Sequence, residues 1–352
     1  MNRPPISADL AGREFSRILI IKPSSPGDII HALPVLRGLR RRFPRAHIAW
    51  LAATPFVNLL DADPALSEVI HFDRAHFARV GRSWRATVDF FKFVRELRGR
   101  KFDLVIDLQG LIRSGFMSLF SGARERIGFR DSRELAWIFY NRRIPRLPPD
   151  MHAADKLFAV SEMLGFEDAP KDFTIEITPE DRAHADELLA QAGVSPVAPF
   201  AVLVPGTRWE TKRWPVDRFG ELAQVLHDRH ALPSVFVGAA SDRKDASRAL
   251  SHQCSALSQQ RHARKEAVGV QMEAVSESDQ RNLCGKTTFR ELAAIIDRAA
   301  IVVTPDSAPM HIAAAHSRPL VALFGPTNPL RTGPHGRLDS VVRLPLACSP
   351  CY

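Results

Sequence analysis

The chain alternates short apolar runs with helical patterns, and each apolar run ends in a loop of small and polar residues. The first run is Arg17–Ile21, and apolar residues at helical spacing follow it from Ile29 to Phe43. A continuous apolar run of this length is typical of a parallel strand that is buried on both faces. The repeated order of strand and helix predicts an α/β protein with parallel sheets.

Two blocks of this pattern are separated by turn-rich sequence. Strands are expected in the first block at 17–21, 47–53, 68–72 and 102–108, and in the second at 201–204, 234–238, 301–304 and 320–324. With 352 residues the chain is too long for one ordinary core. We therefore expect two domains, 1–170 and 171–352. Residues 241–282 are rich in Gln, Ser and charged residues, which predicts an exposed polar insertion of the second domain, helical or disordered.

Positive charge is concentrated in the first domain. The net charge of the chain is +9, and residues 1–170 hold 27 Lys and Arg against 19 Asp and Glu, whereas residues 171–352 hold 21 against 20. This asymmetry predicts an acidic partner or an anionic membrane surface on the N-terminal side, with solubility as the alternative explanation. No apolar run approaches the roughly 20 residues of a membrane span.

Cysteine usage favours a reducing compartment. The four Cys are too few for a disulfide framework. Cys348 and Cys351 form a C-x2-C pair, but a structural zinc site needs four ligands and the chain has no second such pair. We therefore expect a cytoplasmic protein without a bound metal.

A loop of small residues, Ser24–Asp28, follows the first expected strand. Ligands of open α/β sheets bind at the carboxyl ends of strands, and Gly27 lets a ligand approach the backbone closely. Asp28 either faces that ligand or caps the following helix, and the pattern alone leaves both interpretations open.

Two loops of the second block have the chemistry of an anion site. Thr207, Arg208 and Lys212 follow a strand, and a hydroxyl with cations suits a diphosphate, although a solvated basic loop has the same composition. Residues 304–311 end a strand and begin a helix, whose N-terminus can bind an anion. His311 is about one turn into that helix, and the alternative there is a capped helix with a core histidine.

Taken in order, five strings resemble those of family 9 glycosyltransferases, the ADP-heptose:lipopolysaccharide heptosyltransferases. The strings are ILIIKPSSPGDIIHALPVL, FDLVIDLQGLIRS, VLVPGTRWETKRWP, VTPDSAPMHIAAA and VALFGPTNP. The resemblance runs from about Arg17 to Gly336. It implies a GT-B fold, in which two Rossmann-like domains face a central cleft. The N-terminal domain would then bind the acceptor and the C-terminal domain the nucleotide-sugar.

The same resemblance implies roles for individual residues. Asp28 matches the catalytic aspartate, and Ser25, Gly27 and Arg113 match the acceptor side. The donor-binding positions implied are Thr207, Lys212, Asp242, Asp306, Ser307, Ala308 and His311. Ser307 and Ala308 stand where the family more usually has Thr-Gly.

The function implied is an inverting, metal-independent transfer of heptose from ADP-heptose to an acidic lipopolysaccharide inner-core acceptor of the Kdo-lipid A type. No cofactor and no nucleic-acid partner are expected. We expect a cytoplasmic enzyme in peripheral contact with the cytoplasmic face of the inner membrane. The alternatives are another glycan or a protein as acceptor, a nucleotide-sugar epimerase of the same GT-B architecture, and a basic binding protein without catalytic activity.

Overall fold

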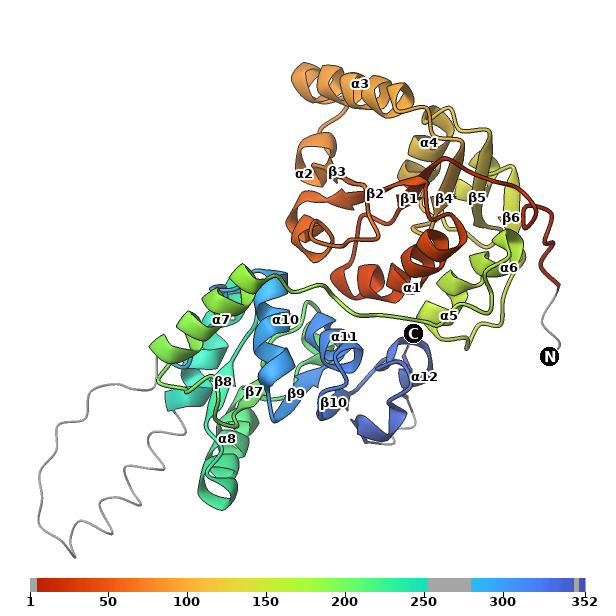
Figure 1. The fold of residues 1–352 in the computed structure, drawn as a ribbon. Coiled ribbons are helices and arrows are strands. Elements are labelled where there is room, and N and C mark those ends of the chain that lie inside the picture. The colour runs from red at the N-terminus through yellow and green to blue at the C-terminus, as the bar shows by residue number, and fades with distance from the viewer. Residues whose placement is uncertain (1–4, 252–279, 345–347, 352) are drawn as a thin grey trace, which may run out of the picture. The chain divides into compact units, whose positions relative to one another are not determined.

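The computed structural model describes residues 5–251, 280–344 and 348–351. The chain divides into two compact units, Met1–Glu176 and Ile177–Tyr352, here called the N-terminal unit and the C-terminal unit. Each unit contains one sheet, and every strand pair in both sheets is parallel (Figure 1). The division falls after residue 176, where the sequence predicts a boundary after 170.

The N-terminal unit has a six-stranded sheet in the order β3-β2-β1-β4-β5-β6. Its strands are β1 (Arg17–Ile21), β2 (His47–Ala53), β3 (Glu68–Phe72), β4 (Leu104–Asp107), β5 (Glu125–Phe129) and β6 (Arg142–Ile144). Its helices are α1 (Pro26–Arg42), α2 (Arg74–Phe77), α3 (Trp84–Gly99), α4 (Ile112–Phe120), α5 (Ala153–Phe158) and α6 (Val160–Leu164). Strands β5 and β6 were not predicted from the sequence, because Glu and Arg residues interrupt their apolar pattern.

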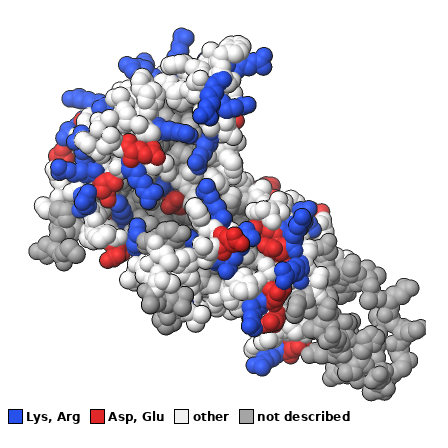
Figure 2. Space-filling view, turned by 180° about the vertical axis from the view of Figure 1, so that it is seen from behind, with Lys and Arg blue, Asp and Glu red and all other residues white. Residues whose placement is uncertain are grey.

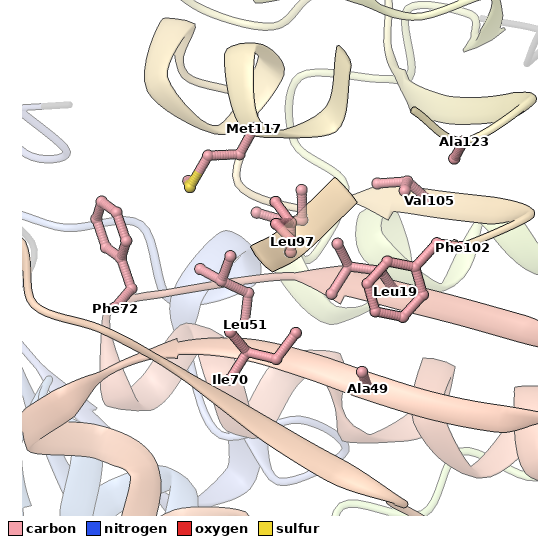
Figure 3. Close-up of a cluster of buried hydrophobic side chains, with 11 residues drawn as sticks. Leu19, Ala49, Leu51, Ile70, Phe72, Leu97, Phe102, Val105, Met117 and Ala123 are labelled. Atoms are coloured by element: carbon pink, nitrogen blue, oxygen red, sulfur yellow. The ribbon is translucent and has the colours of Figure 1, made fainter. Parts of the chain in front are cut away.

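A cluster of buried side chains fixes α3 and α4 to one face of this sheet (Figure 3). Leu19 contributes from β1, Leu51 from the neighbouring β2, Leu97 from α3 and Met117 from α4. Each is almost completely removed from water, and burying such a side chain stabilises the fold by about 1.5–3 kcal/mol. Tight packing on this face holds the loops at the ends of the strands in fixed positions.

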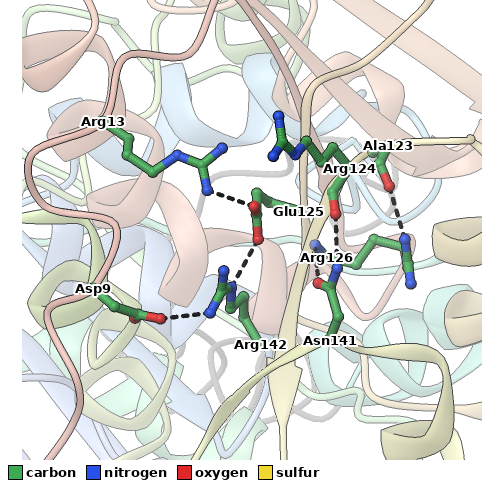
Figure 4. A network of polar contacts seen from close by, with 8 residues as sticks. All are labelled: Asp9, Arg13, Ala123, Arg124, Glu125, Arg126, Asn141 and Arg142. Carbon is green, nitrogen blue, oxygen red and sulfur yellow. Dashed lines mark hydrogen bonds and ion pairs between the residues drawn. The ribbon is translucent and has the colours of Figure 1, made fainter.

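A charged network attaches the N-terminal segment to the sheet edge (Figure 4). The buried Glu125 carboxylate accepts from Arg13 and, at 2.8 Å, from Arg142 Nε. Arg142 also donates to Asp9 at 2.6 Å. Burial alone would raise the pKa of Glu125, but the two guanidinium groups hold it below its usual value.

The C-terminal unit has a five-stranded sheet in the order β11-β10-β9-β7-β8. Its strands are β7 (Ala201–Leu203), β8 (Ser234–Phe236), β9 (Ile301–Pro305), β10 (Leu320–Phe324) and β11 (Val341–Arg343). Its helices are α7 (Pro179–Gln191), α8 (Val216–His230), α10 (Phe289–Arg298), α11 (Ala308–Ala315) and α12 (Pro329–Thr332).

The predicted insertion at 241–282 is helical at its start, which is one of the two forms expected, but its expected exposure is wrong there. Residues 243–251 are helical, and Ala246, Ala249 and Leu250 are buried in the core of the C-terminal unit. These three residues follow helical spacing, so they present one apolar face among many charged neighbours. Residues 252–279 of the predicted insertion lie outside the described residues. At its end Asn282 is buried and forms an isolated parallel bridge with Phe236, so the expected exposure is wrong there too.

Within the described ranges of the chain, no helix combines the length and the apolar character of a membrane span.

Candidate active site

The N-terminal sheet has its topological switch point between β1 and β4. The strand order runs outward through β2 and β3 on one side and through β5 and β6 on the other. Ligands of doubly wound sheets bind at the carboxyl edge at such a point. The two loops that flank it are the Asp28 loop after β1 and the loop 108–111 after β4, so the predicted acceptor residues lie on neighbouring strand ends.

Asp28 caps the helix that follows the first of these loops. Its Oδ2 accepts from the Ser25 backbone N–H at 2.9 Å and from the Ser25 Oγ–H at 2.7 Å. Ser25 is the N-cap residue of α1. Capping, which the sequence pattern left open beside a ligand contact, is therefore observed. It also holds the half-buried carboxylate in one position, which a catalytic base requires.

Gly27 and Arg113 differ in their exposure. Gly27 is buried in the first turn of α1, whereas Arg113 is exposed near the start of α4. Arg113 is therefore available to a negatively charged ligand near the carboxyl edge of β4.

The loop that leads to Arg113 is held by a buried carboxylate. Asp107 ends β4 with no exposed surface and accepts from the Tyr140 hydroxyl at 2.6 Å. Its other oxygen accepts from the backbone N–H groups of Gln109 and Gly110 at 2.9 and 3.1 Å. Burial raises the pKa of Asp107, and these hydrogen bonds oppose that shift. Asp107 was not among the predicted site residues. Its position at the end of the apolar strand LVID was the sequence feature that could have indicated a structural or functional role.

The C-terminal sheet has its switch point between β7 and β9, with β8 on one side and β10 and β11 on the other. The carboxylate of Asp306 joins the loops at this edge. Its Oδ2 accepts from Lys212 Nζ and from Thr327 Oγ1, each at 2.7 Å. Lys212 follows β7, Asp306 follows β9 and Thr327 follows β10. The structure therefore brings Lys212 and Asp306 together, as a pair within the donor residues predicted from the sequence.

Thr327 lies in the segment VALFGPTNP, but it was not among the predicted site residues. Its hydroxyl is buried and directed at the same oxygen of Asp306 that Lys212 contacts. A long-range contact of this kind has no local sequence pattern. The tight turn at Gly325-Pro326 before it was the available signal.

Ser307 and Ala308 form the N-terminus of α11. Ser307 is the N-cap residue, and its Oγ lies 3.1 Å from Thr304 Oγ1 and 3.2 Å from the Pro305 carbonyl oxygen. His311 is buried within the same helix, four residues after the N-cap. The start of an eight-residue helix carries partial positive charge, so this loop suits an anion beside the Lys212–Asp306 pair.

Thr207 and Asp242 are buried and are held by the protein itself. Arg213 Nε donates to the Thr207 carbonyl oxygen at 3.2 Å, and the Ala239 N–H donates to Asp242 Oδ2 at 2.9 Å. A Cβ at Gly206 would lie 2.0 Å from the Asp242 carboxyl carbon, so that carboxylate packs directly on the loop backbone. Asp242 therefore positions this loop, and its expected contact with a ribose stays a prediction.

Of the three described cysteines, the buried Cys284 does not add a reactive group to these loops. Burial raises the pKa of the Cys284 thiol to about 12, so it is protonated at neutral pH. Cys348 and Cys351 are exposed, and Cys351 Sγ lies 3.0 Å from the Cys348 carbonyl oxygen.

Comparison with known proteins gives a consistent result. The model of glycosyltransferase family 9 (heptosyltransferase) matches residues 90–352. The lipopolysaccharide heptosyltransferase 1 of Pseudomonas aeruginosa is 30% identical over 348 residues, which cover 95% of this chain and 86% of that protein. The lipopolysaccharide core heptosyltransferase OpsX of Haemophilus influenzae is 27% identical over 327 residues, with coverages of 92% and 83%.

A solved structure supports the same fold. The Escherichia coli heptosyltransferase WaaC superposes with a TM-score of 0.68 at 24% identity, covering 94% of this chain and 93% of that one. The α/β class and the two parallel sheets predicted from the sequence are thus confirmed, and they match the GT-B fold.

Proposed function

This chain belongs to glycosyltransferase family 9, the heptosyltransferases, and from that membership we propose that it transfers a heptose from ADP-heptose to an acidic acceptor of the lipopolysaccharide inner core. The C-terminal unit binds the donor in this proposal, and the N-terminal unit binds the acceptor. Two curated relatives named for lipopolysaccharide heptose transfer match more than nine-tenths of the chain, which supports the choice of sugar and acceptor class.

The observation that carries the donor site is the arrangement around Asp306. A lysine, a threonine hydroxyl and a helix N-terminus converge at one edge of the C-terminal sheet. This combination of a fixed cation and oriented N–H groups suits a diphosphate. The WaaC structures are described as complexes with ADP and with ADP-2-deoxy-2-fluoro heptose, which supports the same ligand class here.

The proposed reaction is a direct displacement with inversion at the anomeric carbon. Asp28 accepts the proton of an acceptor hydroxyl while that oxygen forms its bond to the anomeric carbon. The bond between this carbon and the diphosphate oxygen breaks, and ADP departs with the electron pair. Lys212, Thr207, His311 and the backbone at Ser307 and Ala308 stabilise the negative charge on the leaving group, in the role that a metal ion fills in other transferases.

The proposed acceptor side is supported by charge. Kdo sugars and lipid A carry carboxylates and phosphates, and residues 1–170 hold 27 Lys and Arg against 19 Asp and Glu. Arg113 is exposed at the carboxyl edge of β4, where its guanidinium can pair with a carboxylate or phosphate. A lipid-linked acceptor also implies peripheral contact with the inner membrane.

Asp28→Asn tests the proposal most directly. The amide oxygen of Asn can still accept the capping hydrogen bonds from Ser25, so α1 keeps its start while the base is lost. We expect transfer to fall by about 10²–10⁴-fold, with ADP affinity and melting temperature close to those of the unchanged protein. The measurement is release of ADP from ADP-heptose with and without a purified Kdo-lipid A type acceptor.

The control is Ser25→Ala, which weakens the same cap but keeps the carboxylate. Its transfer rate should fall much less than that of Asp28→Asn. Normal turnover by Asp28→Asn would show that Asp28 is only a cap. Acceptor-independent conversion of the nucleotide-sugar would instead favour an epimerase, and transfer to a different glycan would replace the proposed acceptor.

A further inference from the structure

Helix α3 (Trp84–Gly99) is apolar on two faces. Its inner face holds the buried Ala86, Val94 and Leu97, and Leu97 belongs to the hydrophobic cluster that packs on the sheet. On the opposite face Trp84 is 73% exposed, Phe91 65% and Val88 41%. These three residues have the spacing i, i+4 and i+7, so they form one stripe along the outside of the helix.

The side chains of the stripe make few ring contacts with the rest of the N-terminal unit. Among the described residues, its ring contacts are those of Trp84 with the Arg85 guanidinium at 5.8 Å and of Phe91 with Phe90 at 6.5 Å. A single exposed apolar residue is ordinary, but a contiguous line of two aromatic residues and a valine on one helix face is typical of a binding surface.

The surroundings of the stripe are strongly basic. Residues 74–99 contain seven Lys or Arg and two Asp or Glu. Arg95 is exposed on the same face as the stripe, and Arg85 and Lys92 are exposed along its flank. Of the seven cations, Lys92 alone forms an ion pair within the described part of the chain, with Asp89 at 3.5 Å. Figure 2 shows Lys and Arg side chains gathered over the upper end of the N-terminal unit, the end that carries α3 in Figure 1.

We infer that the outer face of α3 docks on an anionic phospholipid bilayer. Trp84, Val88 and Phe91 enter the boundary between headgroups and acyl chains, while Arg85, Lys92 and Arg95 contact lipid phosphates. An amphipathic helix with aromatic residues on the apolar side and cations beside them is the form that lies in a membrane interface. The long Lys and Arg side chains can extend their charged ends to the headgroups while their aliphatic parts lie on the apolar layer.

This inference rests on the proposed function in one respect: membrane docking would bring the enzyme to its lipid-linked acceptor. Membrane binding can be measured with no sugar present, and transfer can be measured with a short acceptor that lacks acyl chains. The two proposals therefore fail independently.

The experiment measures flotation of the full chain with two kinds of vesicle. One contains phosphatidylcholine alone, and the other contains phosphatidylcholine and phosphatidylglycerol in equal parts. We expect binding to the mixed vesicles only. The triple variant Arg85→Gln, Lys92→Gln, Arg95→Gln should bind on the order of 100-fold more weakly, since each cation near an anionic surface contributes about fivefold. Trp84→Ala with Phe91→Ala should weaken binding by about tenfold or more.

Matched controls change the same kinds of residue on the C-terminal unit. Arg218→Gln, Arg229→Gln and Arg248→Gln remove three exposed cations, and Val225→Ala trims an exposed apolar residue of α8. These variants should float like the unchanged protein. Arg85→Lys with Arg95→Lys keeps the charge and should also retain binding.

Loss of flotation in both α3 variants, with normal melting temperature and normal transfer to the soluble acceptor, would support the inference. Unchanged flotation of the α3 variants would overturn it, whatever the enzyme transfers. It would also be overturned if the α3 variants abolished self-association in sedimentation, because the stripe would then bind a second copy. Membrane binding through α3 without any heptose transfer would instead reject the proposed function alone.

Discussion

At the residue scale, Asp306 matters in two ways, because its Oδ2 accepts hydrogen bonds from both Lys212 and Thr327. It holds the lysine in place, which the proposed diphosphate site requires, and it is itself a buried charge that needs its partners. Lys212→Ala should therefore weaken ADP binding by about 10–150-fold, as expected for loss of a charge-assisted contact. It should also lower the free energy of unfolding, because Asp306 loses its cation.

A double-mutant cycle with Asp306→Asn separates these two effects. Asparagine carries no charge and can still accept from Thr327, so removing Lys212 in that background should cost little stability. The loss of ADP affinity should remain. Titration calorimetry with ADP and urea unfolding give the two quantities. Equal ADP affinity with and without Lys212 would remove that residue from the donor site.

At the scale of secondary-structure elements, strands that carry charged residues were hard to predict, because partners distant in the sequence neutralise those charges. Strands β1 and β2 were predicted because their apolar runs are continuous, and β3 was predicted from the short apolar pattern in EVIHF. Strands β5 and β6 were missed because Glu125 and Arg142 look like surface residues, yet they pair with each other and with the N-terminal segment. The same reason hid the Asp107–Tyr140 contact, whose partners are 33 positions apart. The local sequence pattern predicted which loops form the candidate site. The contacts between side chains of different loops became visible only in the folded structure.

The Glu125 network leads to a prediction for this sheet edge. The folded-state pKa of Glu125 is lowered, so its stabilising effect is present above the unfolded-state pKa of about 4.3 and is lost as the pH falls. Glu125→Gln should therefore reduce the free energy of unfolding by about 1–3 kcal/mol at neutral pH. The difference from the unchanged protein should shrink toward about pH 3. Urea unfolding at several pH values measures it, and a difference independent of pH would mean that shape, rather than charge, matters at this position.

At the scale of the whole molecule, the excess positive charge lies in residues 1–170, and the structure divides the chain after residue 176. Not every cation of the N-terminal unit is available, however. Arg40 donates to the carbonyl oxygens of Ala65 and Ala46, and Arg42 pairs with Glu14, so both hold the fold. Binding of an acidic acceptor must therefore use exposed cations such as Arg113.

Salt dependence distinguishes the two halves in one experiment. Exposed charges are screened beyond about 8–10 Å at physiological ionic strength, so attraction of an acidic acceptor to many surface cations weakens steeply with salt. In the proposed donor site the contacts come from a few little-exposed groups, among them Lys212 and Thr207, which are screened less. We expect the acceptor KM to rise with NaCl much more steeply than the donor KM. Arg113→Gln should raise the acceptor KM at low salt and reduce this slope, whereas the control Arg229→Gln on the C-terminal unit should do neither. Equal salt slopes for donor and acceptor in the unchanged enzyme would mean that the charge of the N-terminal unit serves solubility or membrane contact and takes no part in acceptor binding.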